Sequence, residues 1–319
     1  MSRVVLDLDA EGNPVDPTTG QAVRGAAVAG FLDRHLAVPE TATDIVVLVH
    51  GWRNTPATAL ARAERFIAVI DGAYGPRYPA LPWACHYVIV RWPSQSSPFL
   101  RGYRRVRDRA HLMSTTGHAA DVLAQLLGYL NTNRTRPNGT LRTAGGQYLH
   151  LIGHSFGCRF LAEAIQWAAE SRPGTLGWNR ADPRYPYAAD TLVLFQMAAP
   201  HDSLTQRFPR LVADSPIAGP VVLTHATTDR AVGLWHRLAE STPGVGFRGA
   251  TLPPDQITPT RLHRLDEPYT AADFPTPVVN VDATWRFRKG HRLLPAGAHA
   301  DIIHPESAHL ILSLAHLAR

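Results

Sequence analysis

Short apolar runs recur along the chain and are separated by segments with helical spacing. The runs span residues 45–49, 87–90, 148–152, 191–197, 221–223 and 278–281. A nearly continuous apolar run is typical of a strand that is buried on both faces, as in a parallel sheet. Strands that alternate with helices therefore predict an α/β fold, with a mostly parallel, doubly wound sheet and helices on both faces.

The segments between these runs place apolar residues three or four positions apart, as one face of a helix requires. Thr55 and Pro56 form a typical helix start, with threonine as the N-cap and proline at the first helical position. We expect one helix over residues 108–131 and a closing helix after Pro305.

Three stretches depart from this alternation. Residues 1–44 hold a short strand and a hairpin-like turn near Gly12, residues 171–190 form a loop, and residues 241–277 form a long excursion with several prolines. Long loops are often functional, so we expect residues 241–277 to roof a functional site. None of the three is long enough for a second domain, so we predict a single domain over residues 1–319 without a large separate lid domain.

The pentapeptide GHSFG, residues 153–157, joins a predicted strand to a predicted helix. A G-x-S-x-G motif in this context forms a tight turn that projects the serine hydroxyl beyond the sheet. We therefore predict Ser155 as a nucleophile. A serine hydroxyl is weak by itself and needs a base and donors for the oxyanion.

The oxyanion donors are predicted from the end of the first long run. There His50-Gly51-Trp52 turns sharply, and glycine permits close approach of the backbone. We expect the backbone N–H of Trp52, or of Gly51, to act together with that of Phe156.

The acid and the base should follow later strands, in the order Ser, Asp, His. Asp229 follows the run at 221–223 and is favoured over Asp202, which follows the preceding run. Asp229 would also suit the N-cap of the next helix. For the base, His299 lies in a loop after the last run and is favoured over His304. His309 falls within the closing helix and His291 is remote.

Four local signatures carry a resemblance to a known group. They are Val49-His50-Gly51-Trp52, Arg91-Trp92-Pro93-Ser94, Leu151-Ile152-Gly153-His154-Ser155-Phe156-Gly157, and Ala298-His299-Ala300-Asp301-Ile302. Over about residues 45–319, the chain resembles the α/β-hydrolase superfamily and, within it, a bacterial serine-hydrolase (esterase-like) branch of largely uncharacterised function. The resemblance implies Ser155, Asp229 and His299 as the catalytic triad.

Three further residues are candidates for the substrate pocket: His50, Trp92 and His154. Packing of a strand end explains Trp92 at least as well. The branch often carries methionine after the serine, where this chain has Phe156, a change that is expected to reshape the pocket and leave the mechanism intact.

Composition limits the kinds of partner that this chain is expected to bind. The formal charge is +6, but Lys289 is the only lysine and the arginines are scattered except for a cluster at 101–109, which we expect in a loop and helix start. Such a cluster usually forms a solvated surface, so we predict no nucleic-acid partner. Cys85 and Cys158 are expected to be buried thiols, and neither a metal nor a cofactor is implied.

No apolar run approaches the length of a membrane span, and the first residues lack a signal core, so the expected location is cytoplasmic. Oligomeric state is beyond the sequence. The predicted function is hydrolysis of a small-molecule carboxylic ester, thioester or amide. The alternatives are an acyltransferase, thioesterase or cyclase acting on a small hydrophobic substrate, and a catalytically silent interaction protein that kept the fold.

Overall fold

The computed structural model describes residues 2–97, 99–132, 147–169, 188–290 and 296–319. Its strands are β1 Ser2–Asp7, β2 Asp44–Val49, β3 Cys85–Arg91, β4 Tyr148–His154, β5 Thr191–Phe195, β6 Val221–His225, β7 Ile257–Arg261 and β8 Val278–Asp282. Its α-helices are α1 Ala27–His35, α2 Pro56–Arg77, α3 Leu100–Thr115, α4 Ala119–Thr132, α5 Phe156–Ala169, α6 Ser203–Gln206, α7 His236–Glu240, α8 Val245–Arg248 and α9 Pro305–Leu317. Short 3-10 turns form η2 Pro209–Leu211 and η4 Ala271–Asp273, and a π-helical segment forms η3 Ala231–Trp235.

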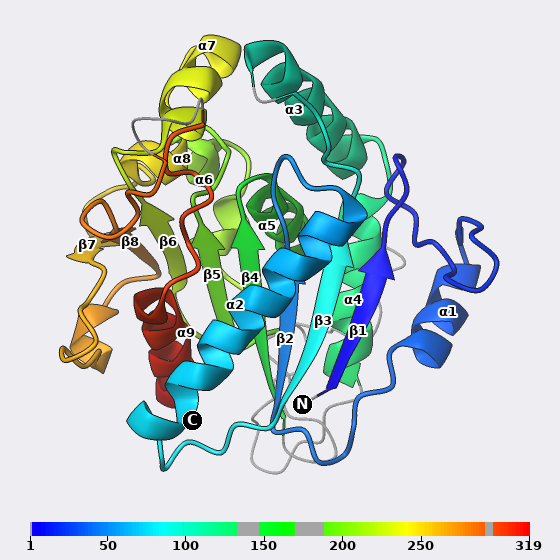
Figure 1. The fold of residues 1–319 in the computed structure, drawn as a ribbon, viewed down its shortest axis with the longest axis horizontal. Coiled ribbons are helices and arrows are strands. Elements are labelled where there is room, and N and C mark those ends of the chain that lie inside the picture. The colour runs from blue at the N-terminus through cyan, green and yellow to red at the C-terminus, as the bar shows by residue number, and fades with distance from the viewer. Residues whose placement is uncertain (1, 98, 133–146, 170–187, 291–295) are drawn as a thin grey trace.

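The described strands form one sheet in the order β1-β3-β2-β4-β5-β6-β8-β7, and every neighbouring pair is parallel (Figure 1). The chain runs outward from β2 to β3, returns past β2 to β4, and then proceeds in the other direction through β5 and β6. In an open parallel sheet, a crevice lies at the carboxyl ends of the strands where the order reverses. Residues that follow β2 and β4 therefore meet at one edge of the sheet.

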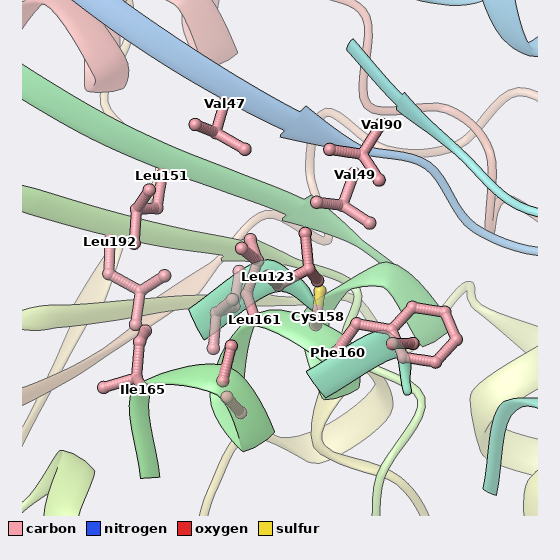
Figure 2. Packing of buried hydrophobic residues seen from close by; sticks show 14 of the residues in the cluster. Val47, Val49, Val90, Leu123, Leu151, Cys158, Phe160, Leu161, Ile165 and Leu192 are labelled. Atoms are coloured by element: carbon pink, nitrogen blue, oxygen red, sulfur yellow. The ribbon is translucent and has the colours of Figure 1, made fainter. Parts of the chain in front are cut away.

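Helices cover both faces of the sheet, as predicted. α2 and α9 pack on one face, whereas α1, α4 and α5 pack on the other (Figure 1). Successive strand residues face opposite sides, so β2 contributes Val47 and Val49 to the core layer under α1, α4 and α5. Val46 and Leu48 face the core layer under α2 and α9. Figure 2 shows the layer under α4, in which Val47 and Val49 lie above Leu123.

The single helix predicted over residues 108–131 is wrong, because α3 and α4 are separate helices. The N-terminal turn breaks the helical path: the His118 backbone N–H donates to the Glu11 carbonyl oxygen at 2.8 Å. Gly117 approaches the same oxygen so closely that a Cβ would lie 2.6 Å from it. Leu112 belongs to α3 and is 58 % exposed instead of facing the core.

The excursion predicted over residues 241–277 is wrong in part, because some of this segment extends the sheet, whereas its role as a roof stays a prediction. β7 pairs with β8 at the sheet edge, with Ile257 opposite Val278. Pro259 lies within β7, and an edge strand tolerates proline because one side of its backbone needs no partner.

The arginine cluster at 101–109 lies inside α3 and not in a loop. The turn near Gly12 is present, with an antiparallel bridge between Leu8 and Pro14. The loop predicted over 171–190 falls almost wholly outside the described residues. None of the helices in the described ranges is long and apolar enough to cross a membrane.

Candidate active site

Ser155 lies on a sharp turn between β4 and α5. Its φ is +58°, in the left-handed region that a non-glycine residue adopts only under strain. The turn is held by the Ser155 N–H, which donates to the Phe195 carbonyl oxygen at 2.9 Å. A Cβ on Gly157 would lie 2.3 Å from the Val49 carbonyl oxygen, so only glycine lets α5 start this close to β2.

The turn after β2 brings its backbone against this serine. A Cβ on Gly51 would lie 2.4 Å from the Cβ of Ser155, which explains the glycine. Within the described part of the chain, the Trp52 backbone N–H donates to no acceptor. Phe156 is the first residue of α5, where an N–H has no acceptor within the helix. The residues that follow Gly51 and Ser155 thus each carry a backbone N–H without an acceptor in the described ranges.

Ser155, His299 and Asp229 form a continuous hydrogen-bonded series. The distance from Ser155 Oγ to His299 Nε2 is 2.7 Å, and the distance from His299 Nδ1 to Asp229 Oδ2 is also 2.7 Å. All three residues are buried. An ionised carboxylate only accepts hydrogen bonds, so Nδ1 carries the proton and Nε2 is the acceptor that faces the serine hydroxyl.

The carboxylate of Asp229 is held by two further donors. Its Oδ1 accepts from the Val232 backbone N–H at 3.0 Å, the kind of contact that an N-cap makes, and its Oδ2 accepts from Gln196 Nε2 at 3.0 Å. Gln196 is wholly buried and also donates to the Gly246 carbonyl oxygen. Gln196 could not be predicted from the sequence, because no local pattern links it to Asp229.

The loop that carries His299 is fixed to the segment that carries Asp229. The Ala298 N–H donates to the Thr228 carbonyl oxygen at 3.1 Å, and the Ala231 N–H donates to the Ala296 carbonyl oxygen at 3.1 Å. These backbone bonds hold Asp229 and His299 at a fixed relative position, so this loop is more constrained than its small residues suggest.

The other candidates lie elsewhere. His304 Nε2 is 2.9 Å from Asp301 Oδ1, and His309 bonds to the hydroxyl of Tyr78 and to a backbone carbonyl oxygen. Asp202 lines a separate cavity beside α6. His291 is outside the described residues. Among the histidines compared in the described ranges, only His299 reaches Ser155.

The candidate pocket residues His50 and Trp92 contact each other at the ends of β2 and β3. His50 Nε2 accepts from the Trp92 backbone N–H at 3.1 Å, and the Trp92 indole N–H donates to the His50 carbonyl oxygen at 2.6 Å. Burial lowers the pKa of His50 to about 4, so it is neutral near pH 7. Both side chains therefore join strand ends in this structure.

His154 contacts the base directly. Its Nε2 is 2.9 Å from the His299 carbonyl oxygen, and since a carbonyl only accepts, the ring donates here. Burial, reinforced by the nearby His299, holds the pKa of His154 well below its usual value. A neutral ring at this point supports the backbone of the base without adding a charge to the site.

Cys85 and Cys158 are free and buried, and burial raises the pKa of both thiols. No group of three or more His, Cys, Asp or Glu side chains in the described ranges is arranged to hold a metal ion.

An aromatic cover closes the site. Ser155 is wholly buried, and the ring of Tyr103 from α3 lies 5.2 Å from the Trp52 ring and 5.4 Å from the Phe156 ring. The Tyr103 hydroxyl is 2.8 Å from Nδ1 of His236, at the start of α7. In Figure 1, α3 and α7 both stand beyond the carboxyl ends of the strands. The Ser155 side chain therefore has no solvent-exposed surface in this structure.

No protein-family model and no curated protein sequence matches the chain. Among solved structures, the catalytic core domain of an acetyl xylan esterase from Trichoderma reesei is similar at 10 % identity and a TM-score of 0.38, covering 86 % of this chain and 98 % of that one. A YdeN-like hydrolase from Pectobacterium atrosepticum is similar at 13 % identity and a TM-score of 0.29, covering 86 % of this chain and 92 % of that one.

Such distant similarities carry no argument about activity, and the fold rests on the chain's own features. The parallel sheet reverses its order between β2 and β4, and the strained serine turn lies at that reversal. Asp229 follows β6 and His299 follows β8, in the chain order Ser, Asp, His. The chain has the α/β-hydrolase fold.

Proposed function

We propose that this chain is a serine hydrolase that cleaves a carboxylic ester through an acyl-enzyme intermediate. The observation that carries the proposal is the buried hydrogen-bonded series from Ser155 through His299 to Asp229, with both links at 2.7 Å. A serine hydroxyl, a neutral histidine and a buried carboxylate in this order are the groups that activate serine in acyl transfer.

In the first step, Ser155 Oγ attacks the ester carbonyl carbon while His299 Nε2 takes the hydroxyl proton. The carbonyl electrons move onto its oxygen, and the amides of Trp52 and Phe156 are the proposed donors to that oxyanion. Asp229 stabilises the imidazolium that forms. The intermediate then collapses: the bond to the leaving oxygen breaks, that oxygen takes the proton from His299, and Ser155 is left acylated.

In the second step, a water molecule attacks the acyl carbon and gives its proton to His299 Nε2. The bond between the acyl carbon and Ser155 Oγ breaks, and Oγ recovers the proton. The products are a carboxylic acid and the leaving alcohol. Because Ser155 is buried in the closed structure, both substrate entry and product release require the cover to open.

A fluorophosphonate tests the nucleophile, because an activated serine displaces its fluoride and keeps the phosphonyl group. We expect one adduct by intact mass, mapped to Ser155 by peptide analysis, and none in Ser155→Ala. Ser94→Ala is the matched control, since Ser94 is also wholly buried but contacts Asn54 and not the base. It should be labelled like the wild type.

Turnover of p-nitrophenyl esters graded by acyl length then tests the reaction. Ser155→Ala should lower kcat/KM on the order of 10⁴-fold or more. No adduct, or an adduct on another residue, would overturn the proposal and favour a silent interaction protein with this fold.

A further inference from the structure

Arg159 is a buried cation on α5, one helical turn beyond Ser155. It is 4 % exposed, and among the described residues its Nε and NH1 atoms have no hydrogen-bond partner. Leaving guanidinium donors unsatisfied in the interior is costly unless a partner arrives. Burial lowers the pKa of Arg159 to about 10, so it still carries its charge at neutral pH.

Arg159 also lines a cavity of about 450 Å³, which is in the range of small-molecule sites. Its walls come from α3, α5, α6, α7 and the segment after β5. Ser203, on α6, also lines the cavity, and its buried hydroxyl has no hydrogen-bond partner in the part of the chain that the structure describes. Two residues that carry unsatisfied buried polar atoms, on different helices, thus line one cavity.

The cavity adjoins the serine turn. Ala199 forms part of its wall, and the preceding residue, Ala198, donates its N–H to the Ser155 carbonyl oxygen at 3.2 Å. At about 1.5 Å rise per residue, four residues of helix separate Arg159 from Ser155 by roughly 6 Å along the axis. The Arg159 guanidinium carbon is 6.0 Å from the centre of the Phe156 ring.

The nearby carboxylates do not satisfy Arg159. Glu240 is its nearest acid, with Oε1 at 4.0 Å from Arg159 NH1 and 3.8 Å from Arg107 Nε, both beyond hydrogen-bond distance. Asp108 pairs with Arg107 at 2.6 Å. Asp202 also lines the cavity, but no ion pair joins it to Arg159 within the described residues.

The other basic side chains that line the cavity already have partners. Arg207 pairs with Glu163 at 2.9 Å and lies 3.3 Å from His111 Nδ1. Burial, together with Arg159 and Arg207, lowers the pKa of His111, so its ring is neutral near pH 7. Arg159 therefore stands out as the cation whose donors remain for a ligand.

We propose that Arg159 and Ser203 form a subsite for a small oxyanion, a carboxylate or phosphate group, carried by the substrate of the adjoining serine site. Arginine offers parallel N–H donors that match two oxygens of such a group, and the Ser203 hydroxyl adds a third donor. The inference rests on the proposed function and deepens it: the preferred ester has an anionic group a few bonds from its reacting carbonyl.

Binding tests the subsite independently of catalysis. Isothermal titration of Ser155→Ala with inorganic phosphate, and separately with glutarate, should give saturable binding that distinguishes the two oxyanions. Adding Arg159→Met to Ser155→Ala should weaken the affinity for whichever oxyanion binds more tightly at least tenfold. A loss of this size is expected when a charge-assisted bidentate contact is removed. Methionine fills much of the same volume and removes an unpaired cation, so the variant should stay folded.

Ser203→Ala provides a second variant that leaves the cation in place and should weaken binding several-fold. Arg105→Met is the matched control, because Arg105 is an exposed α3 residue that does not line this cavity. Ser155→Ala with Arg105→Met should bind both oxyanions with the same affinity as Ser155→Ala alone. Absence of binding for both oxyanions, or binding that survives Arg159→Met, overturns the subsite.

Kinetics then tests whether the subsite serves the serine site. With Ser155 intact, kcat/KM for mono-p-nitrophenyl glutarate should exceed that for p-nitrophenyl butyrate, and Arg159→Met should reduce this ratio at least tenfold. A fluorophosphonate adduct on Ser155 with an unchanged ratio overturns the subsite and leaves the hydrolase standing. Absence of the adduct overturns the hydrolase, whatever the titrations show.

Discussion

Replacing Tyr103 with phenylalanine removes one hydroxyl from the aromatic cover over Ser155 and keeps its ring. That hydroxyl is 2.8 Å from His236 Nδ1 and joins α3 to α7. Burial lowers the pKa of His236 to about 3, so the partner is a neutral ring. A hydrogen bond of this kind contributes about 1 kcal/mol net, and opening the cover between the two helices breaks it. Its loss should raise the open fraction about fivefold, since about 1.4 kcal/mol corresponds to tenfold.

The assay is the second-order rate at which a long-chain fluorophosphonate labels Ser155, measured beside the free energy of unfolding in urea. Tyr103→Phe should label about fivefold faster and lose about 1 kcal/mol of stability. Tyr87→Phe is the matched control, because its hydroxyl is 2.8 Å from Asp71 Oδ1 in the opposite core layer. It should lose similar stability and label at the wild-type rate.

Two results would refute this reasoning. A wild-type labelling rate in Tyr103→Phe, together with the expected loss of stability, would show that the bond between Tyr103 and His236 does not limit access. Equal acceleration in Tyr103→Phe and Tyr87→Phe would show that labelling follows general loosening of the protein.

Two other predictions concern the proposed base, His299, and the stability of the fold at low pH. His299→Ala should reduce kcat/KM for a p-nitrophenyl ester on the order of 10³-fold or more, whereas His304→Ala should stay within about threefold of wild type; the reverse order would move the base. Burial alone would raise the pKa of Asp44, but the hydrogen bond from His150 and the charge of Arg319 outweigh it and lower that pKa. Such a carboxyl stabilises the fold above its unfolded pKa and loses this contribution as pH falls through its folded pKa. Asp44→Asn should therefore cost about 3 kcal/mol at pH 7 in urea unfolding, with a difference that shrinks in acid; a constant difference down to pH 3 contradicts this account.

The strands were predictable where both of their faces are buried, because such strands consist of consecutive apolar residues. Strands β2 and β3 lie between other strands and are covered on both faces, so their apolar runs identify them without ambiguity. The edge strand β7 escaped prediction because its residues are mostly half-buried and include Pro259. The break between α3 and α4 escaped because a contact from Glu11, more than a hundred residues away, creates it.

The same distinction separates the parts of the site. Ser155 and Gly51 belong to local motifs, so sequence alone could nominate them. The pair of Tyr103 with His236 joins residues 133 positions apart and leaves no local pattern. Arg159 did leave a signal, as a charge among the apolar residues that begin α5, but its burial and its unsatisfied donors were needed to interpret that signal.

Asp229 shows why a structural and a catalytic interpretation of one residue need not compete. Its Oδ1 accepts from the Val232 N–H as an N-cap would, and its Oδ2 accepts from His299. A single-atom contact would let the carboxylate rotate, whereas bonds to both oxygens fix the plane in which the histidine must lie. Gln196 adds a second donor to Oδ2 from a different strand end. The helix start after β6 thus does the positioning that a separate residue would otherwise have to do, and the local preference for aspartate at a helix start favours the same residue that the chemistry requires.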